Sequence, residues 1–276
     1  MAREYIARDP RTGERIGAQP TGARTGVGIA AVAPDSGPWQ RLESHEILPL
    51  ANGESGKIEI LADGKTWLLG RIDGVKALAK VPEKDVERAY DSLVDALEDD
   101  FPDVRIAALK TLPSFSLRRQ GILLHCLSDR LQDDEDSVRE EAMTCLKKVA
   151  PLFPSGCEEI LRRELRDTRK DHRGNAFEAL KLASREWPEV GCLHLDELIR
   201  EEEGDLRIRG SMILRTIASK GGAEAWDLIG WSLQDEEVQV RRNASKTLTI
   251  LADVEPRVAV ILVESSIGED DRQISD

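Results

Sequence analysis

The sequence predicts an all-α fold in which one helical hairpin is repeated along most of the chain. Three observations lead to this expectation. An arginine recurs at intervals of 34, 34, 36 and 32 residues, apolar residues at helical spacing follow each arginine, and a short acidic stretch precedes it. Self-similarity at a period of about 20 to 50 residues is typical of solenoids, whose stacked copies share a continuous core. We therefore expect repeats rather than one unique core.

The N-terminal part of the chain differs from the rest. Residues 1–40 are rich in Gly, Pro, Ala and Arg and lack periodicity, so we expect an extended or disordered arm. Residues 41–82 are expected to form a small β-containing element, because Asp63-Gly64 separates two strand-like runs and indicates a β-hairpin. The alternative is a degenerate capping repeat over residues 67–81, since Arg71 lies 34 residues before Arg105.

Residues 83–276 are predicted to form the repeat array. The first helix of each hairpin is marked by apolar residues at a 3.6-residue period, and the recurring arginine begins the second helix. Apolar residues stand one before, three after and seven after that arginine, as at Val138, Ala142 and Leu146. The acidic residue six positions before it lies in the turn, where it can cap free N–H groups. The five pairs are Asp99 and Arg105, Asp133 and Arg139, Asp167 and Arg173, Glu203 and Arg209, and Asp235 and Arg241.

This pattern resembles the HEAT-repeat family, including the short HEAT-like repeats named after phycobilin lyases. The best copies read LQDDEDSVREEAMTCL at 131–146 and LQDEEVQVRRNASKTL at 233–248, and the resemblance covers residues from about 85 to 270. It implies a right-handed α-α superhelical solenoid of about five hairpins plus a C-terminal capping helix. It also implies that the paired acids and arginines form a structural ladder, and that the second helices line a concave face.

Charge gives the first indication of function. The net charge of −13 opposes nonspecific binding to nucleic-acid phosphate. The second helices nevertheless carry cations that the resemblance places on the concave face, where we expect them to contact a partner protein. Some of these cations stand in last helical turns, so stabilisation of the helix dipole is the alternative explanation. The partner-binding candidates are Lys110, Lys147, Lys181, Arg215, Arg242 and Lys246.

No catalytic, metal-binding or cofactor-binding constellation is expected. The four cysteines show no Cys-x-x-Cys spacing, which is typical of buried thiols in a reducing compartment. One His-Glu pair, His45-Glu46, lies outside the array, whereas the di-iron enzymes among HEAT-like proteins need several such pairs. Apolar runs are far shorter than the ~20 residues of a membrane span, so we expect a cytoplasmic protein.

The function expected from these patterns is a noncatalytic protein–protein interaction scaffold. Two alternatives stay open: a lyase-type or other HEAT-like enzyme that handles a cofactor, and a nucleic-acid binder that uses the basic residues of the inner helices. The segment Ala259–Ile267 resembles a first helix and is apolar on more than one face. A terminal repeat normally needs a polar outer face, so either the stack buries this helix or a partner chain, a second copy or downstream sequence covers it.

Overall fold

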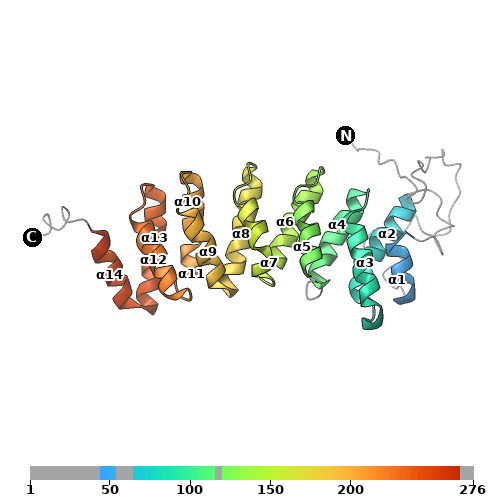
Figure 1. Cartoon of the computed structure of the whole chain (residues 1–276), viewed down its shortest axis with the longest axis horizontal. Helices are drawn as coiled ribbons and strands as arrows, with labels where there is room; N and C mark the ends of the chain where they lie inside the picture. Colours follow the sequence, from blue (N-terminus) through green and yellow to red (C-terminus); the bar gives the residue numbers. More distant parts are fainter. Residues whose placement is uncertain (1–43, 54–64, 116–119, 268–276) are drawn as a thin grey trace, which may run out of the picture. The chain divides into compact units, whose positions relative to one another are not determined.

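A computed structural model describes residues 44–53, 65–115 and 120–267 (Figure 1). These residues are predominantly helical and include no strand, so the predicted all-α repeat fold is confirmed. They fall into two compact units, one up to Cys145 and one from Leu146 onward. The boundary lies inside helix α6 (Asp136–Val149). The predicted arm, residues 1–40, lies outside the described residues.

The first unit contains two successive helical hairpins, α1–α2 and α3–α4, followed by α5 and the beginning of α6. Helix α1 packs on α2, α2 packs on α4, and α3 packs on both α4 and α5. Short 3-10 turns at Leu78–Lys80, Glu83–Asp85 and Leu112–Phe115 connect some of these helices. The helices before α6 are α1 (Ser44–Ala51), α2 (Lys65–Ala77), α3 (Val86–Leu97), α4 (Pro102–Thr111) and α5 (Gln120–Arg130).

The β-hairpin predicted within residues 41–82 is wrong. Its proposed second strand, residues 65–69, begins helix α2, while Asp63-Gly64 lies outside the described residues. Gly74 on α2 shows why the two helices fit: a Cβ there would lie 2.5 Å from the backbone nitrogen of Ala51. Helices α1 and α2 therefore pack closely only because this position has no side chain. The alternative interpretation of this region, a further repeat, matches the structure.

The second unit continues with two layers of helices. First helices α7, α9, α12 and α14 contact one another in sequence, and second helices α8, α10, α11 and α13 form the other layer. Proline occupies the start of α7, α9 and α14, where its missing N–H costs no helical hydrogen bond. The bounds are α7 (Pro154–Glu164), α8 (Lys170–Glu186), α9 (Pro188–Leu198), α10 (Gly204–Ser211), α11 (Leu214–Ile217), α12 (Gly222–Leu233), α13 (Val238–Val254) and α14 (Pro256–Ser266).

Helix packing defines a constant 34-residue register that the sequence pattern only approximated. A small residue, then a leucine four positions later, recurs in every copy and faces the core in all but the last. The small residues are Gly74, Ala108, Ala142, Ala176, Gly210 and Ala244. The leucines are Leu78, Leu112, Leu146, Leu180, Leu214 and Leu248.

The fourth copy was placed two residues too late in the sequence-based alignment. Its second helix is interrupted between α10 and α11, and Leu206, Gly210 and Leu214 are buried there. Met212, which the sequence pattern assigned to the buried stripe, is 57% exposed. Met212 stands three residues after Arg209, so the sequence pattern placed it at an apolar position in a register shifted by two residues.

Candidate functional site

Arginines at the 34-residue period bind the turn of their own hairpin. Nη1 of Arg105 donates to the carbonyl of Asp99 at 2.6 Å, and Nη1 of Arg173 donates to Asp167 O at 2.7 Å. Arg139 makes the equivalent bond to Asp133 O. Arg241 donates to Asp235 O at 2.6 Å. A guanidinium carries several donors in a fixed fork, so one side chain can close the turn and still reach a second acceptor.

Several of these arginines also reach the acidic turn of the next hairpin. Arg105 Nη2 lies 2.8 Å from Asp133 Oδ1, and Arg71 pairs in the same way with Asp99. Arg173 extends instead toward Asp205, at 3.5 Å. Arg71, Arg105, Arg139, Arg173, Arg207 and Arg241, with the turn acids they bind, are called the Asp–Arg ladder below. These contacts occupy the guanidinium groups in structural hydrogen bonds.

The ladder acids act differently from the predicted helix caps. Asp99 Oδ1 accepts from Phe101 N at 2.8 Å, and Asp235 Oδ1 accepts from Glu237 N at 2.8 Å. Phe101 and Glu237 are themselves the residues that precede their helices. Each carboxylate therefore closes a turn two residues long instead of capping the first N–H groups inside the helix. Burial raises the pKa of Asp99, although the neighbouring Arg71 opposes this shift.

In the fourth copy the structure places Arg207, and not Arg209, in the ladder. Arg207 Nη1 donates to the carbonyls of Glu201 and Glu202 at 2.8 and 3.0 Å, and its Nε lies 3.1 Å from Asp235 Oδ2. Arg209 forms a surface pair with Asp205 at 3.2 Å. Glu203 is exposed and precedes α10. The turn acid of this copy is therefore Glu201. The pair Glu203–Arg209 expected from the sequence is wrong, and Glu201 and Arg207 take its place.

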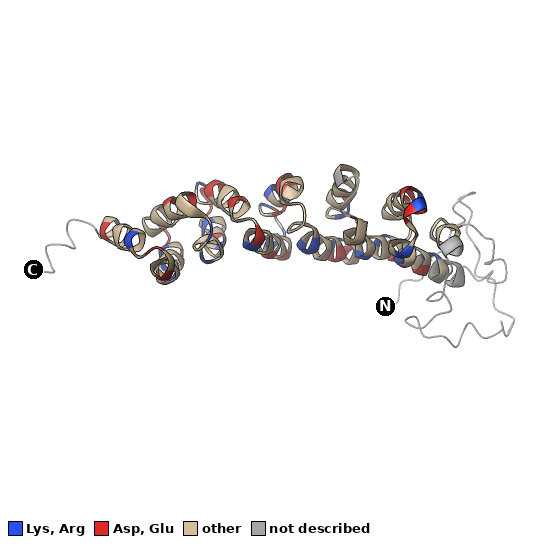
Figure 2. Ribbon diagram, turned by 90° about the horizontal axis from the view of Figure 1, so that it is seen from below, with Lys and Arg blue, Asp and Glu red and all other residues tan. Residues whose placement is uncertain are grey.

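The six cations predicted to bind a partner divide into two groups. The three lysines of the first group each have a side-chain partner. Lys110 lies 3.6 Å from Glu141 in the first unit. In the second unit, Lys147 donates to Asn175 at 2.6 Å, and Lys181 lies 3.6 Å from Glu178. Arg215, Arg242 and Lys246, on α11 and α13, are exposed and have no partner among the described residues. Figure 2 shows acidic and basic residues interspersed along the helices.

One group of potential metal ligands lies at the α7–α8 turn. Ligand atoms of Glu164, Asp167 and His172 lie within 4.8 Å of one another. However, Arg169 binds both oxygens of Asp167, at 2.8 and 2.6 Å, and holds the pKa of that carboxyl well below its usual range. Glu164 accepts from Arg163 at 2.8 Å and lies 3.4 Å from the His172 ring. Protein groups thus already satisfy these oxygens.

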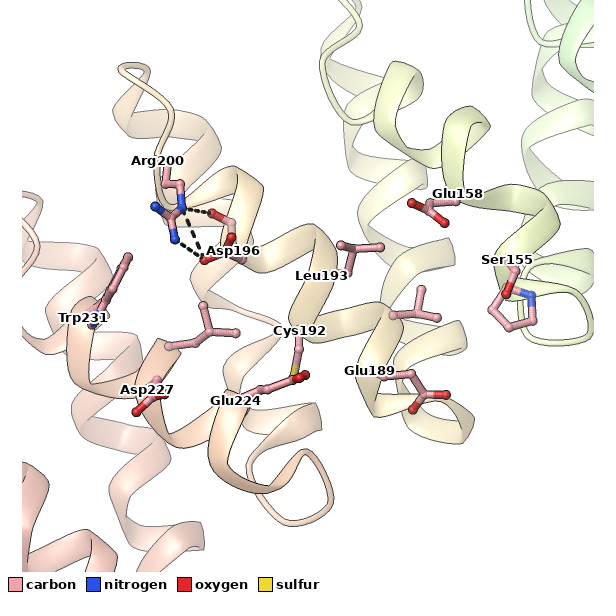
Figure 3. Close-up of a pocket in the computed structure, with 13 residues that line it drawn as sticks. Ser155, Glu158, Glu189, Cys192, Leu193, Asp196, Arg200, Glu224, Asp227 and Trp231 are labelled. Carbon is pink, nitrogen blue, oxygen red and sulfur yellow. Dashed lines mark hydrogen bonds and ion pairs between the residues drawn. The ribbon is translucent and has the colours of Figure 1, made fainter.

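A groove of about 650 Å³ runs across three first helices of the second unit (Figure 3). We call it the α7–α9–α12 groove. No residue of the second helices lines it, so it lies on the helix layer opposite to the predicted basic surface. Its lining residues are Pro154, Ser155, Glu158, Glu189, Val190, Cys192, Leu193, Asp196, Arg200, Glu224, Asp227, Leu228 and Trp231.

Helical spacing explains why these side chains converge. Glu189, Leu193 and Asp196 stand four and three residues apart on α9, and Glu224, Asp227 and Trp231 are spaced similarly on α12. Residues at such spacing share one face of a helix. The groove therefore consists of the solvent-facing stripes of adjacent helices.

The floor of the groove is apolar and partly open to solvent. Val190 and Leu228 are almost fully buried, whereas Leu193 is 43% exposed and Trp231 is 56% exposed. Exposed apolar side chains gathered in one concave surface are typical of a binding site, whereas scattered ones are common on any protein.

The rim of the groove is acidic. Glu158 accepts a hydrogen bond from Arg162 at 3.1 Å, and Asp196 pairs with Arg200 at 2.7 Å. The carboxylates Glu189, Glu224 and Asp227 have no ion-pair partner among the described residues. The groove thus offers three uncompensated negative charges beside its apolar floor.

Arg200 shows how the groove holds a cation. Its guanidinium carbon lies 4.8 Å from the centroid of the Trp231 ring, while Asp196 binds the same group from the side (Figure 3). A cation within about 6 Å of an indole face is attracted by the ring quadrupole. An aromatic face and a carboxylate therefore already act together on one guanidinium.

The groove does not assemble a nucleophile with a base. Burial raises the pKa of Cys192 to about 11, so its thiol stays protonated near pH 7. Ser155 lines the groove, but no histidine does. The remaining buried thiol of this unit, Cys157, has its pKa raised to about 12 by burial. Acyl or group transfer through a covalent intermediate would need an activated nucleophile.

The sequence-based search missed the groove, although one signal was present. Trp231 occupies the register position held by Glu197, Arg163 and Asp129 in the preceding copies, at successive distances of 34 residues. A large exposed aromatic residue in a column of charged residues departs from the repeat. Trp231 is therefore marked in the sequence by its difference from the equivalent residues of the other copies.

The C-terminal helix ends the second unit with apolar side chains in solvent. Ala259 is buried, but Val260 and Ile261 are 55% and 61% exposed. The predicted helix is present as α14. What covers its outer face stays a prediction. None of the helices in the described ranges has the length and apolar character that crossing a bilayer requires.

No protein-family model matches the chain, and no curated protein sequence matches it. Among solved structures, it is similar to a HEAT-like repeats protein from Thermococcus onnurineus NA1, with 13% identity, a TM-score of 0.46, and coverage of 84% of this chain and 94% of that one. It is also similar to computationally designed armadillo repeat proteins for modular peptide recognition, with 16% identity, a TM-score of 0.39, and coverage of 75% and 99%.

A third similarity is to the complex of CpcE and CpcF of phycocyanin lyase from Nostoc sp. PCC7120, with 16% identity and a TM-score of 0.37 over 85% of this chain and 93% of that one. All three are low-identity similarities to helical-repeat proteins, so none bears on what this chain binds. The ladder contacts and packed hairpins of the chain itself show a helical-repeat fold, which is the fold that the resemblance to HEAT repeats implies.

Proposed function

We propose that this chain is a noncatalytic scaffold that binds a partner protein, and that the α7–α9–α12 groove is the main contact surface. The observation that carries the proposal is the combination of an exposed Trp231 and Leu193 with three unpaired carboxylates in one concavity. Aromatic anchors surrounded by polar rims are characteristic of protein interfaces.

The apolar floor is large enough to contribute measurably to binding. Covering the exposed parts of Trp231 and Leu193 would remove on the order of 200 Å² of apolar surface from water, worth about 5 kcal/mol before the costs of association. Such a contribution supports a specific but moderate interaction. The groove volume of about 650 Å³ accommodates a few side chains of a partner.

The absence of a nucleophile–base pair in the groove favours binding over catalysis. Cys192 is held as a thiol, and no histidine lines the groove to act as its base. The exposed cations Arg215, Arg242 and Lys246 provide a second candidate surface, on the opposite helix layer, for the interaction predicted from the sequence.

Affinity purification from native lysate tests this proposal with three forms of the full chain. We expect the wild type and Arg242→Glu/Lys246→Glu to retain the same protein partner, and Trp231→Ala/Leu193→Ala to lose it while keeping its helical content by circular dichroism. The two replaced residues in the groove variant are 43% and 56% exposed, so its fold should persist. A chromophore, metal or enzymatic activity that copurifies without a protein would refute the scaffold, and loss only in the α13 variant would refute the groove.

A further inference from the structure

The groove combines two features that select the chemistry of its occupant. Glu189, Glu224 and Asp227 supply uncompensated negative charge, and Trp231 supplies an aromatic side chain that is 56% exposed. An anionic or purely apolar segment would leave these carboxylates desolvated without a partner, which is costly. A cationic segment would compensate them.

Arg200 provides an internal example of the same recognition. Its guanidinium stacks on Trp231 at 4.8 Å and pairs with Asp196 at 2.7 Å, at one end of the groove. Its side chain is 57% exposed, and exposed ion pairs contribute little free energy, so a partner cation can compete with it. The rest of the groove has carboxylates but no second cation among its lining residues.

From this complementarity we infer that the α7–α9–α12 groove binds a partner segment in which a lysine or arginine lies next to a bulky apolar side chain. The apolar side chain packs between Leu193 and Trp231, and the cation lies among Glu189, Glu224 and Asp227. Arg200 competes for the same aromatic face and the same rim, which keeps the affinity of the free groove low. The inference deepens the proposed function and rests on it.

Labelled peptides measured by fluorescence anisotropy test this chemistry directly. The probes are three fluorescein-labelled peptides of equal length that alternate arginine with leucine, arginine with glycine, and glutamate with leucine. We expect the full chain to bind the arginine–leucine peptide at least ~10-fold more tightly than the other two, since it alone satisfies both the rim and the floor. Equal binding of the glutamate–leucine peptide would overturn the inference.

A matched pair of charge reversals separates the groove from the overall negative field of the protein. Glu224→Lys/Asp227→Lys alters the rim, whereas Glu186→Lys/Asp253→Lys alters exposed residues of α8 and α13. Each double variant changes the net charge of −13 by four units, to −9. We expect the rim variant to weaken arginine–leucine binding about 10-fold and the control less than about 3-fold. Equal losses would show nonspecific attraction and refute the inference.

Removing the internal competitor gives a test that loss of folding cannot imitate. Arg200→Gln frees the Trp231 face and the Asp196 carboxylate, so we expect the arginine–leucine peptide to bind about 3-fold more tightly. Weaker binding would refute the inference. The lysate experiment separates this inference from the proposed function. A partner that Glu224→Lys/Asp227→Lys retains but Trp231→Ala/Leu193→Ala loses would refute the cationic occupant and leave the scaffold intact. The absence of any partner would refute the proposed function.

Discussion

The corrected register of the fourth hairpin predicts very different effects for two arginines on the same short helix. Arg207 binds two backbone carbonyls at 2.8 and 3.0 Å and approaches Asp235 at 3.1 Å, and the two side chains are only 13% and 9% exposed. Arg209 pairs with Asp205 across one helical turn, with side chains 29% and 55% exposed. Both residues stand on α10, two positions apart.

The magnitudes follow from burial and hydrogen bonding. Removing one partner of a buried, hydrogen-bonded ion pair costs about 3–5 kcal/mol, and partial exposure places Arg207→Ala near the lower end, at about 3 kcal/mol. An exposed pair across one helical turn contributes about 0.3–0.5 kcal/mol, which is the loss expected for Arg209→Ala. Arg207→Lys should retain charge but lose the fork, and should therefore fall between the two.

Urea unfolding followed by circular dichroism measures these losses, and amide hydrogen exchange in the turn between α9 and α10 locates them. Repeat arrays can unfold in more than one step, so the local exchange rates carry as much weight as the midpoint. Comparable destabilisation by Arg209→Ala and Arg207→Ala would refute the 34-residue register. It would equally refute the assignment of the turn contacts to Arg207.

Three further predictions concern packing, thiol reactivity and pH. In urea unfolding, Gly74→Ala should destabilise the first unit by about 1–3 kcal/mol, because the new Cβ meets the backbone of Ala51. Gly121→Ala adds a Cβ in open space and should stabilise the protein by roughly 0.5 kcal/mol. The reverse order would contradict the packing. Cys157, fully buried with a pKa of about 12, should resist alkylation by N-ethylmaleimide at pH 8 until urea unfolds the chain, and rapid native labelling would disprove its burial. Burial lowers the pKa of His194, so below the ordinary histidine pKa of about 6.5 the unfolded state binds more protons than the folded state. The free energy of unfolding should therefore fall as the pH decreases from 7 to 5, and it should fall less in His194→Leu. Parallel pH profiles of the two proteins would rule this out.

Much of the fold could be predicted from the sequence because the repeat enforces the same chemistry at each turn. Arg105, Arg139, Arg173 and Arg241 close their turns through the same Nη1–carbonyl contact, and this demand keeps them at a fixed spacing. The fourth copy failed because Arg209, two residues after Arg207, has an acidic residue six positions earlier as well. Sequence spacing could not distinguish the two, whereas burial and hydrogen bonding do.

The first hairpin was missed for a related physical reason. Its second helix has glycine at the small-residue position, and Gly74 lowers helix propensity while it permits close packing with Ala51. Local preferences of residues 65–69 favour a strand, but these residues begin helix α2, which packs on α1 and α4. Arg71, buried against Asp99, was the one residue in this region that carried the repeat signal.

The groove could not be predicted from the pattern that predicts the fold, because a repeat constrains only the positions that every copy must bury or hydrogen-bond. Solvent-facing positions of the first helices are free of that constraint, and most carry charge, as Glu197 and Asp129 do in the column of Trp231. Exposing an indole there costs solvation free energy, and the contact with the Arg200 guanidinium covers the ring only in part, since Trp231 stays 56% exposed. A large apolar residue at a position where the repeat requires none supports the proposed binding role of the groove. The same reasoning separates Trp231 from Leu214, whose burial the repeat fully explains.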